Sequence, residues 1–214
     1  MGFFGFSEES RENQEPVKTE RNESFEGSKY RYVTLKAKIE DLEEMETLVF
    51  NFTEQIGQIK HEEDVYFDVP QGQLKLRYTR PNRQHAELIA YEQTNEFGPN
   101  ICEYRTSRIN DPEIFHKTLS MTLPELGVIH RKRRTYAKDH VVINLDEMEN
   151  LGLFIDIIIA ADGSNDTKQI ELVNKLKKDF GIDDCNLVSL SYLDLLRKHK
   201  SFDSGLDDES DLFE

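Results

Sequence analysis

The stretch Tyr32-Val-Thr-Leu-Lys-Ala-Lys-Ile39 alternates between two kinds of side chain. Its apolar residues fall on one face of an extended strand. The opposite face carries polar and basic residues: Tyr32, Thr34, Lys36 and Lys38. A strand of this kind covers a core with one face and presents charge with the other. The charged face is either ordinary solvated surface or the lining of a wet channel.

Two later segments repeat the pattern. Segment 74–79 alternates Lys75 and Arg77 with apolar residues, and segment 129–136 places His130, Lys132 and Arg134 on one face. We expect these faces to converge in a closed sheet whose apolar outer side packs against helices and whose charged inner side forms a channel. For any one strand taken alone, a solvated face is the alternative.

The hydrophobic periodicity of the whole chain predicts its strands and helices. Eight strands are predicted at 32–39, 64–69, 74–78, 87–93, 101–107, 128–137, 140–146 and 152–160. Helices are predicted at 40–52 and 112–124, and a C-terminal helical pair at 166–180 and 186–198. So many strands with few helices favour a barrel over a doubly wound sheet. The predicted fold is therefore α+β, an antiparallel β-barrel tunnel of about eight strands covered by helices.

Composition indicates one folded unit with two acidic tails. The chain has 214 residues, of which 37% are hydrophobic, enough for one core. Of the net charge of −15, residues 1–28 carry −4 and residues 199–214 carry −5. Neither tail has a periodic apolar face, so we expect both to be disordered and residues 29–198 to form the domain.

The net negative charge and the absence of long apolar runs indicate which partners and which location to expect. Binding to nucleic acid requires an exposed basic face, so we expect no nucleic-acid partner. No apolar run approaches the length that spans a bilayer, and the first residues lack a charged leader region, which predicts no membrane partner and an intracellular, cytoplasmic protein, with the nucleus also possible. Bases clustered by alternation favour a local pocket for a small anionic ligand instead.

Several ordered motifs carry a family resemblance. They are the run 33–39, Asp64-Val-Tyr-Phe67 followed by Pro70-x-Gly-x-Leu-Lys-Leu-Arg77, Lys132-Arg-Arg134, Leu145-Asp-Glu147, Leu151-Gly-x-Phe154 and Tyr192-x-Asp194-Leu-Leu196. Over residues 30–197 the chain resembles the CYTH superfamily of triphosphate tunnel proteins, which includes class IV adenylate cyclases and thiamine triphosphatases. The resemblance implies a β-barrel tunnel in which Lys and Arg hold a triphosphate and Glu residues hold Mg²⁺ or Mn²⁺.

Carried over by position, the basic half of such a site is mostly present. Lys36 matches the lysine of the family's Glu-x-Glu-x-Lys motif. The resemblance and the strand alternation together predict six phosphate-binding residues: Lys36, Lys38, Lys75, Arg77, Lys132 and Arg134. Two family bases are replaced, by Gln93 and Val142. With few acids expected opposite these bases, we predict an empty channel strained by repulsion among like charges.

The acidic half departs further from the family pattern. Tyr32 and Thr34 replace both glutamates of Glu-x-Glu-x-Lys, and Asp156 and Ile158 stand where the family has a second Glu-x-Glu pair. Hard divalent cations need carboxylate and water oxygens, so only a weak residual metal site is predicted, at Asp146 and Asp156. We expect no cofactor to be required for binding, and Mg²⁺ or Mn²⁺ to matter only if activity remains.

Three further residues are predicted to line the channel: Asp64, Tyr104 and His130. Asp64 is expected to pair either with a metal or with a channel base. For Tyr104 the alternative is packing, and for His130 it is a hydrogen-bonded role with no part in chemistry.

These observations predict a CYTH-like protein that binds a triphosphate or other polyanion in a basic tunnel. The missing carboxylates favour a catalytically impaired pseudoenzyme with a regulatory or adaptor role. One alternative is an active metal-dependent triphosphatase or adenylate cyclase-like enzyme. The other is an interaction scaffold that engages protein partners through its acidic tails.

Overall fold

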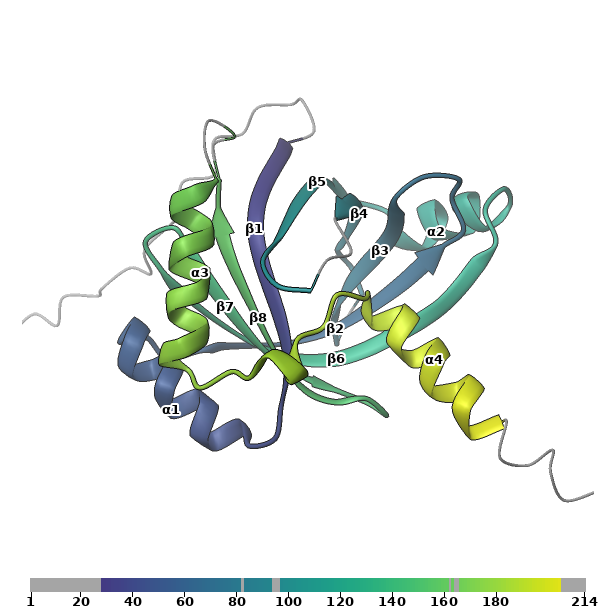
Figure 1. Ribbon diagram of the computed structural model, residues 1–214. Coiled ribbons are helices and arrows are strands. Elements are labelled where there is room, and N and C mark those ends of the chain that lie inside the picture. The colour runs from purple at the N-terminus through teal and green to yellow at the C-terminus, as the bar shows by residue number, and fades with distance from the viewer. Residues whose placement is uncertain (1–27, 82, 94–96, 162, 164–165, 205–214) are drawn as a thin grey trace, which may run out of the picture.

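Eight antiparallel strands close into a barrel in the computed structural model of the chain (Figure 1). The structure describes residues 28–81, 83–93, 97–161, 163 and 166–204. The strands are β1 (Ser28–Ile39), β2 (Gln58–Phe67), β3 (Gln73–Arg80), β4 (Ala86–Gln93), β5 (Asn100–Ile109), β6 (Glu125–Lys138), β7 (Val141–Met148) and β8 (Gly152–Ala160). They follow one another round the barrel as β1-β5-β4-β3-β2-β6-β7-β8. The predicted α+β fold, an eight-stranded tunnel with helices, is confirmed.

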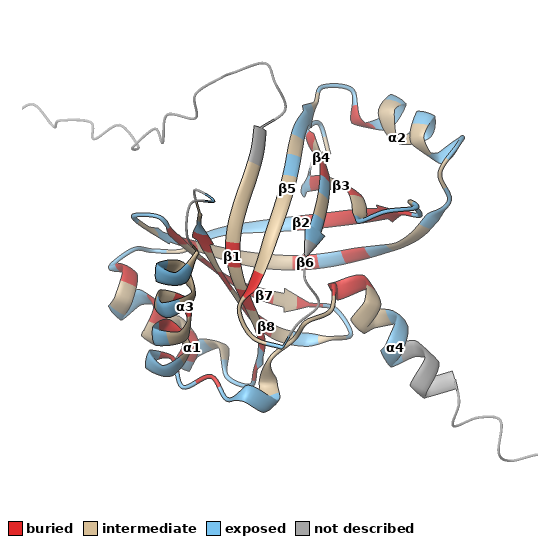
Figure 2. Cartoon of the chain, turned by 45° about the horizontal axis from the view of Figure 1, so that its top comes forward, coloured by how far each residue is buried: buried red, intermediate tan, exposed pale blue. Residues whose placement is uncertain are grey.

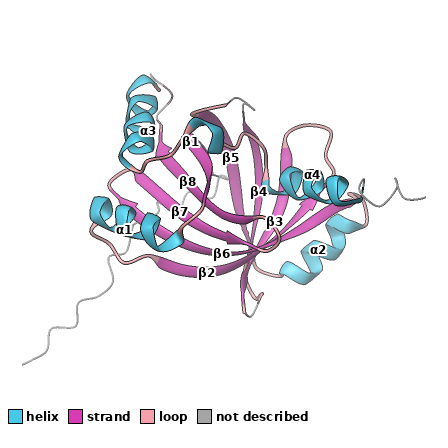
Figure 3. Ribbon diagram, turned by 60° about the horizontal axis from the view of Figure 1, so that its bottom comes forward, coloured by secondary structure: helices cyan, strands magenta, loops and turns pink. Residues whose placement is uncertain are grey.

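In the described part of the chain, four α-helices lie outside the sheet, in two pairs. They are α1 (Leu42–Thr53), α2 (Pro112–Ser120), α3 (Thr167–Asp179) and α4 (Tyr192–Ser204). Figure 3 shows α1 and α3 on one side of the barrel and α2 and α4 on the other. The start of α1 is set by Asp41, whose carboxylate accepts from the backbone N–H groups of Glu43 and Glu44. Within the described part of the chain, no helix has the length and apolarity to cross a membrane.

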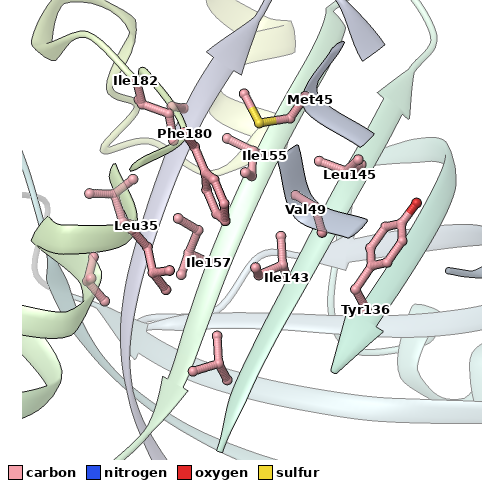
Figure 4. Packing of buried hydrophobic residues seen from close by; sticks show 14 of the residues in the cluster. Leu35, Met45, Val49, Tyr136, Ile143, Leu145, Ile155, Ile157, Phe180 and Ile182 are labelled. Atoms are coloured by element: carbon pink, nitrogen blue, oxygen red, sulfur yellow. The ribbon is translucent and has the colours of Figure 1, made fainter. Parts of the chain in front are cut away.

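The main core lies on the outer face of β1, β7 and β8. Leu35, Ile143 and Ile157 are fully buried there and pack against apolar residues of α1 and α3, including Val49 and Leu176 (Figure 4). These strand residues are the apolar members of the alternation, so the charged members must point into the barrel. The predicted apolar outer side is confirmed for these strands, and the predicted charged inner side is confirmed for Lys36 of β1.

Two smaller cores complete the enclosure. Val65, Leu76 and Tyr78 on the outer face of β2 and β3 pack against α2. At one end of the barrel, Tyr192 and Leu193 at the start of α4 pack among residues of the inner face. Figure 2 shows this buried start of α4 against the sheet, with the helix becoming exposed further along. The first turn of α4 therefore closes this end of the barrel.

The C-terminal helical pair has different bounds from those predicted. Residues Asp184–Asn186 form a single 3-10 turn, and the next residues run extended beside β1, where the Val188 N–H donates to the Lys36 carbonyl at 2.9 Å. The predicted second helix at 186–198 thus begins only at Tyr192 and continues to Ser204. Bonding to β1 satisfies the backbone groups that a helix would have satisfied internally. Of the predicted tails, residues 1–27 and 205–214 lie outside the described residues.

Candidate functional site

A cavity of about 590 Å³ fills the barrel and is lined by inward-facing residues of the strands and by the start of α4. Lys36 of β1 lines it, as do Lys75 and Arg77 of β3. These three residues were predicted to face the channel, and their placement agrees with that prediction. Tyr32, Thr34 and Ile158, which stand where the family has carboxylates, also line the cavity, as does Val142. Gln93 has no described side chain.

The predicted inner face of β6 is wrong by one residue. Arg131 and Arg133 line the cavity, whereas Lys132 and Arg134 lie outside and contact Glu147 at 3.0 and 3.2 Å. His130 is also outside and is 47% exposed. Residues 131–134 are all basic, so charge alternation cannot tell the two faces apart. Burial of Ile129 at the α4 end and of Tyr136 beneath α1 sets the register instead.

Lys38 also differs from its predicted place. It lies on the same face of β1 as Lys36, but its cross-strand neighbour is Phe154, beyond the level of Asp156, and its side chain is exposed. It is not among the residues that line the cavity. Of the six predicted phosphate-binding residues, Lys36, Lys75 and Arg77 are brought together, and Lys38, Lys132 and Arg134 are not.

Asp64 lies at the centre of an ionic network inside the barrel. Its carboxylate accepts from Arg77 at 2.7 and 3.0 Å, and its Oδ2 lies 2.8 Å from Lys75 Nζ and 3.2 Å from Arg131 Nη2. Burial opposes ionisation, but the neighbouring cations outweigh it and hold the pKa of Asp64 well below its usual range. Of its two predicted roles, pairing with a channel base is the one observed.

Glu62 joins the same network from β2. Its Oε2 accepts from Arg131 Nε at 2.8 Å and lies 3.5 Å from Arg77 Nε. Burial alone would raise the pKa of this carboxyl, yet the charges of Arg77, Arg131 and Arg133 lower it to about 2. The predicted channel short of acids, strained by its own bases, is therefore wrong, because Glu62, Asp64 and Asp146 neutralise those bases.

The carboxylate of Asp146 accepts hydrogen bonds from two other side chains of the protein. Arg133 donates two parallel hydrogen bonds to its carboxylate, at 2.7 and 2.6 Å, and Tyr192 donates a third at 2.8 Å. Burial is outweighed by Arg133 and these hydrogen bonds, which lower the pKa of Asp146 to about 2. The guanidinium of Arg133 also lies 3.8 Å from Asp156 and 4.0 Å from Glu62.

The donor set fits a divalent cation poorly. A metal at Asp146 and Asp156 would have to displace Arg133, a permanent cation that already neutralises the first of them. The described residues contain no cluster of three or more acidic, histidine or cysteine side chains that could hold a metal. Asp156 lines the cavity and Asp146 is buried behind it, and the guanidinium of Arg133 contacts both of these predicted residual ligands.

The two lysines of the cavity differ in their surroundings. Lys36 Nζ lies 3.5 Å from the Leu190 carbonyl and 4.3 Å from the centre of the Tyr192 ring, and among the described residues no carboxylate oxygen is within 4.0 Å. Burial lowers the pKa of Lys36. For Lys75, burial outweighs the nearby Asp64 and lowers the pKa to about 7. Lys75 therefore titrates near neutral pH, and among the described residues Lys36 has no carboxylate oxygen within ion-pair distance.

The opposite end of the cavity is aromatic. The rings of Tyr32 and Tyr104 stack with centroids 5.0 Å apart and an interplanar angle of 15°, and Tyr30 lies 5.2 Å from Tyr104. Tyr104 thus lines the cavity as predicted, and it also packs. Sequence reasoning missed Tyr30, Glu62, Arg131 and Arg133; the strict alternation of β1 and β2 would have found the first two.

Comparison with known proteins agrees with this geometry. No family model matches the chain. A Methanocaldococcus jannaschii protein named "Putative adenylate cyclase MJ0240" is 28% identical over 182 residues, which cover 76% of this chain and 97% of that protein. The solved structure of PH1012 from Pyrococcus horikoshii shares the fold with a TM-score of 0.69 at 20% identity, over 77% of this chain and 98% of that one.

A third similar structure is that of "Putative adenylyl cyclase HpAC1" from Hippeastrum, a protein with a dominant triphosphatase activity. Its TM-score is 0.57 at 14% identity, over 79% of this chain and 95% of that one. The chain therefore has the closed eight-stranded barrel fold of these solved structures and is similar over nearly the full length of the Methanocaldococcus protein. Both findings fit the resemblance to the CYTH superfamily of triphosphate tunnel proteins.

Proposed function

We propose that the protein binds a phosphate-bearing anion, a triphosphate or another polyanion, in the barrel cavity, and that metal-dependent turnover of this ligand is impaired. The observation that carries the proposal is the placement of Arg133 among Asp146, Asp156 and Glu62. A guanidinium there supplies the positive charge that a divalent cation would supply in an active site, but it cannot activate a water molecule as a metal does.

The cavity retains the means to hold an anion. Lys36 offers an ammonium that no carboxylate neutralises within 4.0 Å among the described residues. The cavity bases are Lys36, Lys75, Arg77, Arg131 and Arg133, and the facing acids are Glu62, Asp64, Glu87, Asp146 and Asp156. These five carboxylates balance the five bases. A strongly charged ligand therefore has to compete with internal carboxylates, so we expect modest affinity and a regulatory or adaptor role.

An active metal-dependent triphosphatase or adenylate cyclase-like enzyme is the second candidate. The observation that favours it is the 28% identity to the Methanocaldococcus protein over nearly all of that protein's length. Asp156 still lines the cavity and is only loosely approached by Arg133. Bound metal and substrate together would have to rearrange the Arg133 contacts in this case.

The scaffold alternative rests on the acidic tails predicted at 1–28 and 199–214, of which residues 1–27 and 205–214 lie outside the described residues and residues 199–204 form the end of α4. Deleting the tails discriminates between the candidates, because a scaffold then loses its protein partners while a cavity binder keeps its ligand. The cytoplasmic location and the absence of nucleic-acid and membrane partners remain predictions.

The deciding experiment offers a panel of triphosphates with Mg²⁺, with Mn²⁺ and with a chelator. We expect tripolyphosphate to raise the melting temperature in chelator by several degrees at about a hundredfold excess over Kd. Phosphate release and cyclic nucleotide formation should stay at background. Lys36→Met should lose the melting shift, while Lys132→Met, a matched change outside the barrel, should keep it. Robust hydrolysis that is abolished by Asp156→Ala would establish the active enzyme instead.

A further inference from the structure

The tyrosines at one end of the cavity form a continuous aromatic surface. Tyr30 and Tyr32 project from β1 and Tyr104 from the adjacent β5, where Tyr30 and Tyr104 are direct cross-strand partners. The three ring centroids lie 5.0 to 6.0 Å from one another. The Tyr104 hydroxyl donates to the Tyr32 hydroxyl at 3.2 Å, so the two stacked rings also meet at their polar edges. All three residues line the cavity and none is fully buried.

Apolar side chains extend this surface round the barrel. Ile158 of β8 pairs across the strands with Thr34 and with Val142, next to the tyrosines, and Ile89 of β4 pairs with Thr106 beside Tyr104. All of these residues line the cavity. The tyrosine end is thus largely aromatic and aliphatic, while the charged network, Lys36 and Glu87 line the rest of the cavity. A cavity with this division matches a ligand that has one apolar planar end and one anionic end.

We infer that the tyrosine end is a subsite for a planar aromatic ring and that the ligand is an aromatic phosphate ester. Its ring lies against Tyr32 and Tyr104, and its phosphate lies toward Lys36. This inference rests on the proposed function, because it assumes that the charged end holds a phosphate. It adds what that end alone does not determine, the chemical class of the remainder of the ligand.

Charge and size limit the ligand further. A cavity whose bases are already balanced by carboxylates suits one phosphate better than three, because each further phosphate must draw arginines away from Glu62 and Asp64. The cavity volume of about 590 Å³ accommodates a ring and a phosphate together. Flat aromatic groups stack on tyrosine more favourably than saturated rings of similar area do, since the ring quadrupoles complement each other in offset geometry.

Two probes of equal charge test the inference on the unmodified full chain. Phenyl phosphate and cyclohexyl phosphate both carry one phosphate on a six-membered ring, and only the first ring is aromatic and flat. Binding is measured by calorimetric titration in chelator, with pyrophosphate as a probe that has no ring. We expect phenyl phosphate to bind about tenfold more tightly than cyclohexyl phosphate.

Substitutions locate the subsite. Tyr32→Leu and Tyr104→Leu keep apolar volume but remove the flat face, and each should weaken phenyl phosphate binding about tenfold with little change for pyrophosphate. Tyr32→Phe keeps the ring and should bind phenyl phosphate as the unmodified chain does. If a leucine variant fails to fold, the comparison of the two esters on the unmodified chain still decides the question.

The outcomes separate the two proposals. Equal affinity for both esters, or leucine variants that weaken all three probes alike, would overturn the aromatic subsite while leaving phosphate binding intact. If no phosphate-bearing probe binds, the proposed function fails as well.

Discussion

The carboxylates inside the barrel are held as anions by arginines, and this makes the fold sensitive to acid. Glu62 has a pKa of about 2 in the folded protein and 4.5 as its ordinary value. A depressed pKa contributes stability that is present above about pH 4.5 and is lost as the pH falls toward about 2. The shift corresponds to about 3 kcal/mol, an upper figure for a coupled network.

Urea unfolding measured from about pH 6 to about pH 3 checks this prediction through the slope of the free energy of unfolding. Glu62→Gln should give a shallower slope, because the titrating group has gone. Glu171→Gln, an exposed acid on α3, should leave the slope unchanged. Equal slopes for all three proteins would mean that the Glu62 ion pairs do not form in solution.

Lys75 makes anion binding depend on pH near neutrality. Its pKa of about 7 in the empty cavity means that a bound anion must draw a proton onto the amine. Affinity should therefore be highest below about pH 7 and should fall as the pH rises toward the ordinary pKa of 10.5. Sulfate is a suitable probe, since it does not titrate in this range. Calorimetry should find a pH-dependent Kd in the unmodified chain and a weaker dependence in Lys75→Met, in which Lys36 is the cavity lysine that remains.

At the scale of the element, β6 carries bases on both faces, and their contributions to stability should differ sharply. Arg131→Ala leaves Glu62 and Asp64 without a buried partner and should cost about 3 to 5 kcal/mol. Lys132→Ala removes a half-exposed contact to Glu147 and should cost less than about 1 kcal/mol. Denaturant midpoints measure both changes. A larger loss for Lys132→Ala than for Arg131→Ala would mean that Lys132, and not Arg131, points into the barrel.

In a channel of mutually repelling bases, removal of Arg77 would stabilise the protein without ligand. In the barrel, Arg77 donates two hydrogen bonds to Asp64, so Arg77→Ala should lower the melting temperature.

At the scale of the whole molecule, barrel closure brings β1 beside β8 and sets which residues can form a metal site. Thr34 and Ile158 are direct cross-strand partners, and both line the cavity. The double change Thr34→Glu and Ile158→Glu therefore adds two glutamates near Asp156, and the Cβ atoms of the two glutamates lie about 5 Å apart. We expect a gain of at least tenfold in Mn²⁺ affinity, measured by calorimetry, whereas the unmodified chain should bind Mn²⁺ weakly. Unchanged affinity in the double variant would place these two side chains outside the cavity.

The sequence by itself determined the barrel, the outer cores of β1, β7 and β8, and the inward direction of Lys36, Lys75 and Arg77. Strict alternation of apolar and polar residues is a local signal, and a buried outer face leaves only one direction for the charged residues. The reversed face of β6, the closure of one end by Tyr192 and the pairing of Asp146 with Arg133 were decided only by the tertiary structure. The closure by Tyr192 depends on which helix lies at the end of the barrel. Arg133 and Asp146 are cross-strand partners on the consecutive strands β6 and β7, but they pair inside the barrel only because β6 turns Arg133 inward, and four consecutive bases leave no periodic pattern that shows this direction.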